Sequence, residues 1–110
     1  RSPRVTGVLT CALPILKIMI SQPMRGKTEK EIKNEREALV KKLQEEGHEV
    51  LETVFEDFDC YASPIAYLAR SIEFLDKADA VVFMKGWENA RGCKIEHEIA
   101  LKYGKYIKEL

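Results

Sequence analysis

Three consecutive side chains, Glu96, His97 and Glu98, are of the types that move protons, attack electrophilic carbon and bind metal ions. They follow Gly92 in the stretch RGCKIEHEIALKYGK, whose apolar spacing predicts a helix over residues 91–103. A polar triplet near the start of an amphipathic helix has three interpretations. It forms a metal site, it supplies a catalytic carboxylate, or it belongs to a solvated polar face.

One face of this helix is apolar and is expected to contact a sheet: Ile95, Ile99 and Tyr103. Glu96 lies at the border of that face and is expected to be partly shielded, whereas His97 and Glu98 point outward. A partly buried carboxylate costs stability unless it is paired or has a function. An acidic residue in the first turn also compensates the helix dipole. Spacing alone therefore leaves Glu96 with a catalytic and a purely electrostatic interpretation.

A metal site is the next alternative, because Cys93 and His97 are four residues apart on one helix face. A structural zinc ion needs four ligands. The other histidine, His48, is expected at the opposite end of the sheet, while Cys60 could lie nearer. The sequence contains no HExxH and no CxxC motif. The simpler interpretation is a small buried Cys93 and a surface His97.

Alternating strand and helix patterns are expected to position these side chains. The predicted strands cover residues 17–21, 48–55, 78–84 and 105–108, and the predicted helices cover 28–46, 63–75 and 91–103. Thr28 with Glu31 forms a capping box, and Ser63 with Pro64 is a typical helix start. This order predicts an α/β protein, a three-layer Rossmann-like or flavodoxin-like sandwich with a four-stranded parallel sheet.

Ligands of open α/β sheets bind beyond the carboxyl ends of the strands. Three predicted loops lie there: residues 21–27, 55–62 and 85–93. In the first, SQPMRGK, Arg25 and Gly26 precede a helix N-terminus, where backbone N–H groups and the helix dipole favour an anion. The loop has one glycine and is not a Walker motif. It is either a phosphate or carboxylate site, to which Arg25 adds a bidentate contact, or a solvated basic turn.

Length and composition limit the classes of protein. A chain of 110 residues is one domain, and its 18 basic and 18 acidic residues leave no basic excess for binding polymeric nucleic acid. Three widely spaced cysteines fit a reducing, cytoplasmic environment. The longest apolar stretch, residues 8–20, is interrupted by Pro14 and Lys17 and is too short for a membrane span.

Residues 1–16 fit the rest of the sequence badly, because they lack an initiating Met and a clear period. A basic start before an apolar stretch is also found in signal peptides, but residues 17–20 continue into a strand without a small-residue cleavage site. We therefore expect residues 1–16 to be a non-native or disordered leader and residues 17–110 to be the domain.

Two stretches, KIMISQPMRG and ADAVVFMKGWENARGCKIEHEIALKYGK, together resemble the nucleoside 2-deoxyribosyltransferase superfamily, most closely a small phage and bacterial branch. The resemblance covers about residues 17–110 and is most specific at Ala78-Asp79, Gly92, Glu96 and Ala100. It implies a Rossmann-like sheet, a homodimer or larger homo-oligomer, and no metal or organic cofactor. It also implies that Glu96 attacks C1′ of a 2-deoxyribosyl group and that a nucleobase departs.

The same resemblance implies roles for further residues. Ser71 stands where family members carry the aspartate that orients the nucleophile, and Asp79 is a second supporting catalytic candidate. Arg25 stands at a phosphate-binding position, which favours a 5′-monophosphate substrate. The remaining substrate-binding candidates lie in the same crevice loops: Ser21, Gln22, Met24, Gly26, Trp87, Arg91 and Gly92.

Trp87 and Tyr61 could stack on a base, or anchor their loops or a subunit contact. The expected partner is a small deoxynucleoside or deoxynucleotide, with neither polymeric nucleic acid nor a membrane. The expected function is cleavage or transfer of an N-glycosidic bond. The alternative is a non-catalytic nucleotide-binding or interaction module on the same fold.

Overall fold

A four-stranded, all-parallel sheet with the strand order β2-β1-β3-β4 forms the centre of the molecule. The computed structural model describes residues 15–51 and 63–110. Its elements are β1 (Lys17–Ser21), α1 (Glu29–Glu45), β2 (Glu49–Val50), α2 (Pro64–Lys77), β3 (Ala80–Phe83), the 3-10 turn η2 (Trp87–Asn89), α3 (Arg91–Lys102) and β4 (Tyr106–Glu109). The predicted α/β class and parallel sheet are confirmed.

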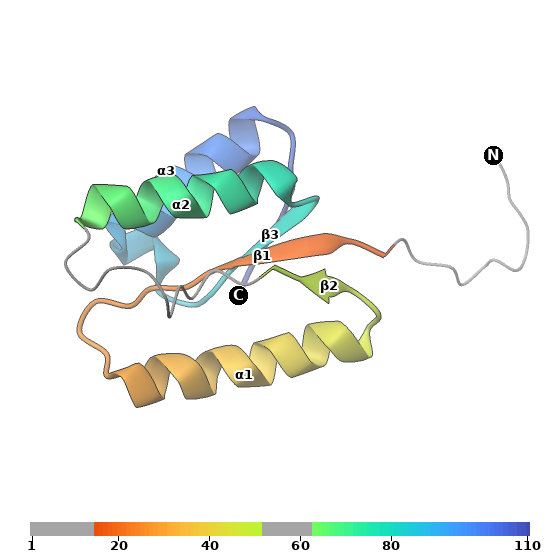
Figure 1. Cartoon of the computed structure of the whole chain (residues 1–110), viewed down its shortest axis with the longest axis horizontal. Helices are drawn as coiled ribbons and strands as arrows, with labels where there is room; N and C mark the ends of the chain where they lie inside the picture. Colours follow the sequence, from red (N-terminus) through yellow and green to blue (C-terminus); the bar gives the residue numbers. More distant parts are fainter. Residues whose placement is uncertain (1–14, 52–62) are drawn as a thin grey trace, which may run out of the picture.

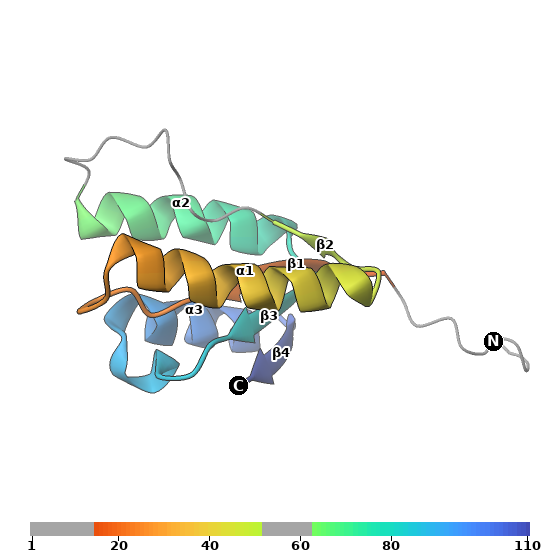
Figure 2. The ribbon, with the colours of Figure 1, turned by 90° about the horizontal axis from the view of Figure 1, so that it is seen from below.

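Helices cover the sheet on both sides, with α1 on one face and α2 and α3 on the other (Figures 1 and 2). The core is accordingly divided in two. Ile18, Ile20 and Val82 pack with Leu43 of α1. On the opposite face, the core cluster contains Met19, Leu75, Ala78, Val81, Phe83 and Ala100. Alternate residues of one strand therefore serve different layers, which is the three-layer sandwich that the sequence predicts.

The two central strands are buried along their length because helices cover both of their faces. All four residues of β3 are buried, and so are the last four of β1. The second strand covers Glu49–Val50 and does not include His48 or Leu51 of its predicted range, while residues 52–55 lie outside the described residues. The predicted leader up to residue 14 and the predicted loop residues Cys60 and Tyr61 also lie outside them.

Local sequence signals explain where two helices begin. The Thr28 hydroxyl accepts a hydrogen bond from the Glu31 backbone N–H at 3.1 Å, and the Glu31 carboxylate accepts one from the Thr28 backbone N–H at 3.1 Å. At α2, the Ser63 hydroxyl accepts from the Ala66 backbone N–H at 3.1 Å. Both predicted caps are confirmed. Within the described residues, no helix has the length and apolar character needed to cross a bilayer.

Candidate active site around a buried glutamate

Glu96 lies in the second turn of α3 and is 6% exposed. The Ser21 hydroxyl, at the carboxyl end of β1, donates a 2.6 Å hydrogen bond to Glu96 Oε1. Ser21 itself is 2% exposed, so this contact lies in the interior. It places the carboxylate at the edge of the sheet where parallel α/β proteins bind their ligands.

Two further side chains complete a small polar cluster at this edge. Ser71 of α2 forms a side-chain hydrogen bond to the Glu96 carboxyl group. The thiol of Cys93, one turn before Glu96 on α3, forms a hydrogen bond with Ser21. Elements far apart in sequence are thereby joined at Glu96.

Burial raises the pKa of Glu96 from its ordinary value, and the hydrogen bonds from Ser21 and Ser71 act in the opposite direction. Burial also raises the pKa of the Cys93 thiol, which the Ser21 contact lowers and the nearby charge of Glu96 raises again. The thiol is therefore held in its neutral, unreactive form. The carboxyl group, by contrast, has two donors that favour its anion, so Glu96 is the better candidate nucleophile.

The buried face of α3 differs from the predicted one. The structure buries Cys93, Glu96 and Ala100, while Ile95 is 37% exposed and Tyr103 is 76% exposed. The prediction that Ile95 and Tyr103 face the sheet was wrong. It assigned the buried face from the positions of large apolar side chains alone. Close approach of a helix to a sheet instead favours small ones, and Ala100 is fully buried there.

The sequence predicts that His97 points into solvent, and this prediction is wrong. The side chain packs inward and is 19% exposed. Its ring stacks on Trp87 at 4.1 Å between centroids and contacts the Phe83 ring edge-on at 4.8 Å. Its Nε2 lies 2.7 Å from the Glu109 carboxylate at the end of β4. Glu98 is exposed and pairs with Lys102 at 3.0 Å. The predicted outward position is therefore confirmed for Glu98 but not for His97.

The loop after β1 contributes both buried and exposed groups. Gln22 is 7% exposed, and its Nε2 donates to the Ile32 carbonyl at 2.8 Å, which ties the loop to α1. Met24, Arg25 and Gly26 are exposed, and Gly26 has a positive φ of 80° that favours glycine in this turn. Of the predicted substrate-binding residues in this loop, Gln22 is therefore buried and holds the loop in place. The other three are exposed and include the charge of Arg25.

The loop between β3 and α3 forms the other side of this edge. A Cβ built on Gly86 would lie 3.8 Å from the Pro23 side chain, so the two loops lie close together here. Gly92 lies against Leu68 of α2, whose side chain is 4.0 Å from where a Cβ would be. Arg91 is exposed at the first residue of α3. Trp87 is half-buried and has a stacking partner within the chain, which supports its loop-anchoring interpretation.

Asp79 lies at the other end of the sheet from Glu96. Its Oδ2 accepts a hydrogen bond from the Lys17 backbone N–H at 2.9 Å, and Lys17 is the first residue of β1, whereas Ser21 is the last. The structure therefore does not bring Asp79 together with the predicted nucleophile. An acidic residue just before a buried strand serves here to join the beginnings of two strands.

The possible metal ligands do not converge. Cys93 bonds to Ser21, whereas His97 is held between Trp87 and Glu109. Among residues 15–51 and 63–110, no three or more His, Cys, Asp or Glu side chains are grouped so that they could hold a metal ion.

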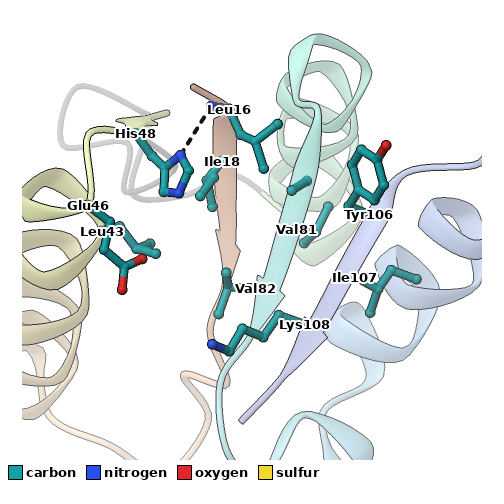
Figure 3. Close-up of a pocket in the computed structure, with 11 residues that line it drawn as sticks. Leu16, Ile18, Leu43, Glu46, His48, Val81, Val82, Tyr106, Ile107 and Lys108 are labelled. Carbon is teal, nitrogen blue, oxygen red and sulfur yellow. Dashed lines mark hydrogen bonds between the residues drawn. The ribbon is translucent and has the colours of Figure 1, made fainter. Parts of the chain in front are cut away.

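A separate, mainly apolar hollow lies beside α1 on the face of the sheet opposite α3 (Figure 3). Leu43, Val82 and Tyr106 are among the residues that line it. His48 also lines the hollow, and its Nδ1 accepts a hydrogen bond from the Leu16 backbone N–H at 3.1 Å. This bond joins His48 to the residue just before β1, at the end of the sheet opposite the polar cluster around Glu96.

Comparison with known proteins identifies one family. The model of a domain of unknown function (DUF4406) matches residues 16–109, which is most of the chain. No curated protein and no solved structure matches the chain.

Proposed function

We propose that this chain, which belongs to the DUF4406 family, is an enzyme that cleaves or transfers the N-glycosidic bond of a 2′-deoxynucleoside or its 5′-monophosphate. The observation that carries the proposal is the Glu96 carboxyl group. It is 6% exposed, lies at the carboxyl edge of a parallel sheet and receives hydrogen bonds from Ser21 and Ser71. A shielded carboxylate with fixed orientation suits a reaction that develops positive charge on carbon.

In the proposed reaction, a Glu96 oxygen forms a bond to C1′ of the sugar while the C1′–N bond breaks. The nucleobase leaves with the bonding electrons and takes up a proton. Water or a second base then attacks C1′ of the glycosyl ester and frees the Glu96 carboxylate. Ser21 and Ser71 orient the carboxylate and offset part of the rise in its pKa that burial causes, which favours the anion.

The N-termini of α1 and α3, which both lie at this edge, differ in their capacity to bind phosphate. At α1, the capping box already uses the backbone N–H groups of Thr28 and Glu31, and Glu29 and Glu31 add negative charge. At α3, no side chain caps the first turn, which contains no acidic residue. Arg91 and Lys94 are exposed in that turn. The start of α3 is therefore the favoured position for a 5′-phosphate. Arg25, in the neighbouring loop after β1, adds a second positive charge to the proposed site.

A second candidate function is the binding of a nucleotide without turnover. The observation that favours it is also the burial of Glu96, because a 6% exposed side chain must become more accessible before it can touch C1′. The two functions differ in one product. An enzyme releases free base, whereas a binding module returns the nucleotide intact.

The test uses the exposed residue Glu98 as a matched control on the same helix. Wild type, Glu96→Gln and Glu98→Gln are incubated with each of the four common deoxynucleosides and their monophosphates, and free base is measured by chromatography. We expect base release by the wild type and Glu98→Gln and none by Glu96→Gln. Equal turnover by Glu96→Gln contradicts the proposal. Binding of a monophosphate by the wild type without base release selects the second function.

The proposal includes assembly into a homodimer or larger homo-oligomer, as the resemblance implies. Light scattering on the purified chain measures its mass in solution. A monomer at the concentration that supports base release contradicts this part of the proposal and leaves the role of Glu96 to the chromatographic assay.

A further inference from the structure

We propose that His97 is a positioning residue for Glu96, because its bond to Glu109 fixes the rotation of α3 that directs the Glu96 carboxylate at Ser21. This inference rests on the proposed function of Glu96 and concerns how the fold holds that carboxylate in place. His97 is not assigned a contact with substrate.

The register of the sheet aligns the two residues that hold α3. Ser21, Phe83 and Glu109 form one row across the carboxyl ends of β1, β3 and β4. The two outer members of this row hold consecutive residues of α3. Ser21 bonds Glu96 at 2.6 Å, and Glu109 bonds His97 at 2.7 Å.

The geometry of an α-helix makes these two contacts act together against rotation. Consecutive side chains of an α-helix diverge by about 100°. A helix that is held by one side chain can roll about its axis, whereas a helix held by two diverging side chains breaks one contact when it rolls. The His97–Glu109 bond therefore opposes the rotation that would withdraw Glu96 from Ser21.

The surroundings of the imidazole show that its position is built into the fold. Phe83 from β3 and Trp87 from η2 contact the ring, and these two rings lie 5.4 Å apart between centroids. Glu109 from β4 is the ionisable group that bonds the ring. The nearby carboxylates of Glu88 in η2 and Glu98 in α3 are exposed. A histidine that served only as a solvated surface residue would not be enclosed from three elements.

Two variants separate the bond to Glu109 from the aromatic stacking. His97→Gln keeps an N–H donor for Glu109 but loses the ring, and His97→Phe keeps a ring against Trp87 but loses the donor. Trp87 is the only tryptophan of the chain, so its fluorescence reports the stacking without a label. Glu109→Ala removes the bond from the other side, and Glu98→Gln is the control on the exposed face of α3.

If His97 positions Glu96, the kcat for base release falls by about 10²-fold in His97→Phe and Glu109→Ala, while KM changes little. His97→Gln recovers most of the lost turnover although its Trp87 emission moves to longer wavelength. His97→Phe keeps the wild-type emission although its turnover is low. The double variant His97→Phe/Glu109→Ala is no slower than either single variant, because both remove the same bond.

The opposite pattern overturns the inference. Wild-type turnover in His97→Phe, with loss of turnover in His97→Gln, means that the ring only packs. If the wild type releases no base, the proposed function fails, and hydrogen exchange of the α3 amides decides the positioning role by itself. Faster exchange in His97→Phe and Glu109→Ala than in His97→Gln supports that role, and equal exchange in all three contradicts it.

Discussion

Replacement of Glu96 by Gln is expected to make the folded protein more stable at neutral pH while it abolishes base release. The reason is the balance of energies at the carboxyl group. Two hydrogen bonds to a charged acceptor contribute about 1.5–3 kcal/mol each. The pKa of Glu96 is nevertheless raised, so the cost of desolvating its charge exceeds what Ser21 and Ser71 return. A glutamine has no charge to desolvate, and both serine hydroxyls can bond its amide.

The pH dependence of this difference follows from proton linkage. In the folded protein the pKa of Glu96 lies above its ordinary value of 4.5, so between these two values the folded state binds more protons than the unfolded state. The stability of the wild type therefore falls as the pH rises from 4.5 through the folded-state pKa, and it changes no further at higher pH. Glu96→Gln lacks this slope, so its advantage is absent below pH 4.5 and fully developed above the folded-state pKa.

Urea unfolding of both proteins at a series of pH values between 4 and 8 measures this advantage. The upper limit avoids the Cys93 thiol, whose raised pKa introduces a separate slope above its ordinary value of 9.0. We expect the unfolding free energy of Glu96→Gln to exceed that of the wild type by on the order of 1 kcal/mol at pH 8. A less stable Glu96→Gln at pH 8, or a difference that does not change with pH, would refute this account of the buried carboxyl group.

Three further substitutions test other parts of the site. Ser71→Ala removes a bond that lowers the pKa of Glu96, so the rise of base release with pH is expected to move to higher pH, as a pH–rate profile would show; an unmoved profile contradicts the assigned contact. Arg25→Ala is expected to raise KM for a deoxynucleoside monophosphate about tenfold and to leave KM for the free nucleoside unchanged, because one charge-assisted contact is lost; equal effects on both substrates argue against a phosphate contact. Asp79→Ala is expected to cost about 1 kcal/mol of stability through the lost bond to Lys17, measured by urea unfolding, with turnover retained; loss of turnover in a folded variant would return Asp79 to the reaction.

The sequence was sufficient to predict the layers of the fold because their signals are local. The apolar runs of β1 and β3, the capping box at Thr28 and the Ser63-Pro64 start each specify an element without knowledge of its neighbours. The alternation of strands and helices then leaves few topologies, and the parallel sheet follows.

The candidate site was only partly predictable, for a physical reason. Glu96 is a candidate from its spacing on the helix and Ser71 from the resemblance, and the structure joins the two by a side-chain hydrogen bond. The inward position of His97 depends on Glu109 and Trp87, which the sheet register and a 3-10 turn bring to α3. A helical period gives the spacing of side chains on one helix, but the rotation of that helix is set by contacts that are distant in sequence.

The near-contact between Gly86 and Pro23 has a consequence for protein engineering. The loop that leaves β1 and the loop that leaves β3 lie close together at this point, where a methyl group on the glycine would reach ordinary packing distance. Exchanging one loop between relatives would therefore open a gap or create a clash against the loop that stays behind. Variants designed to alter the proposed substrate site should therefore replace both segments together.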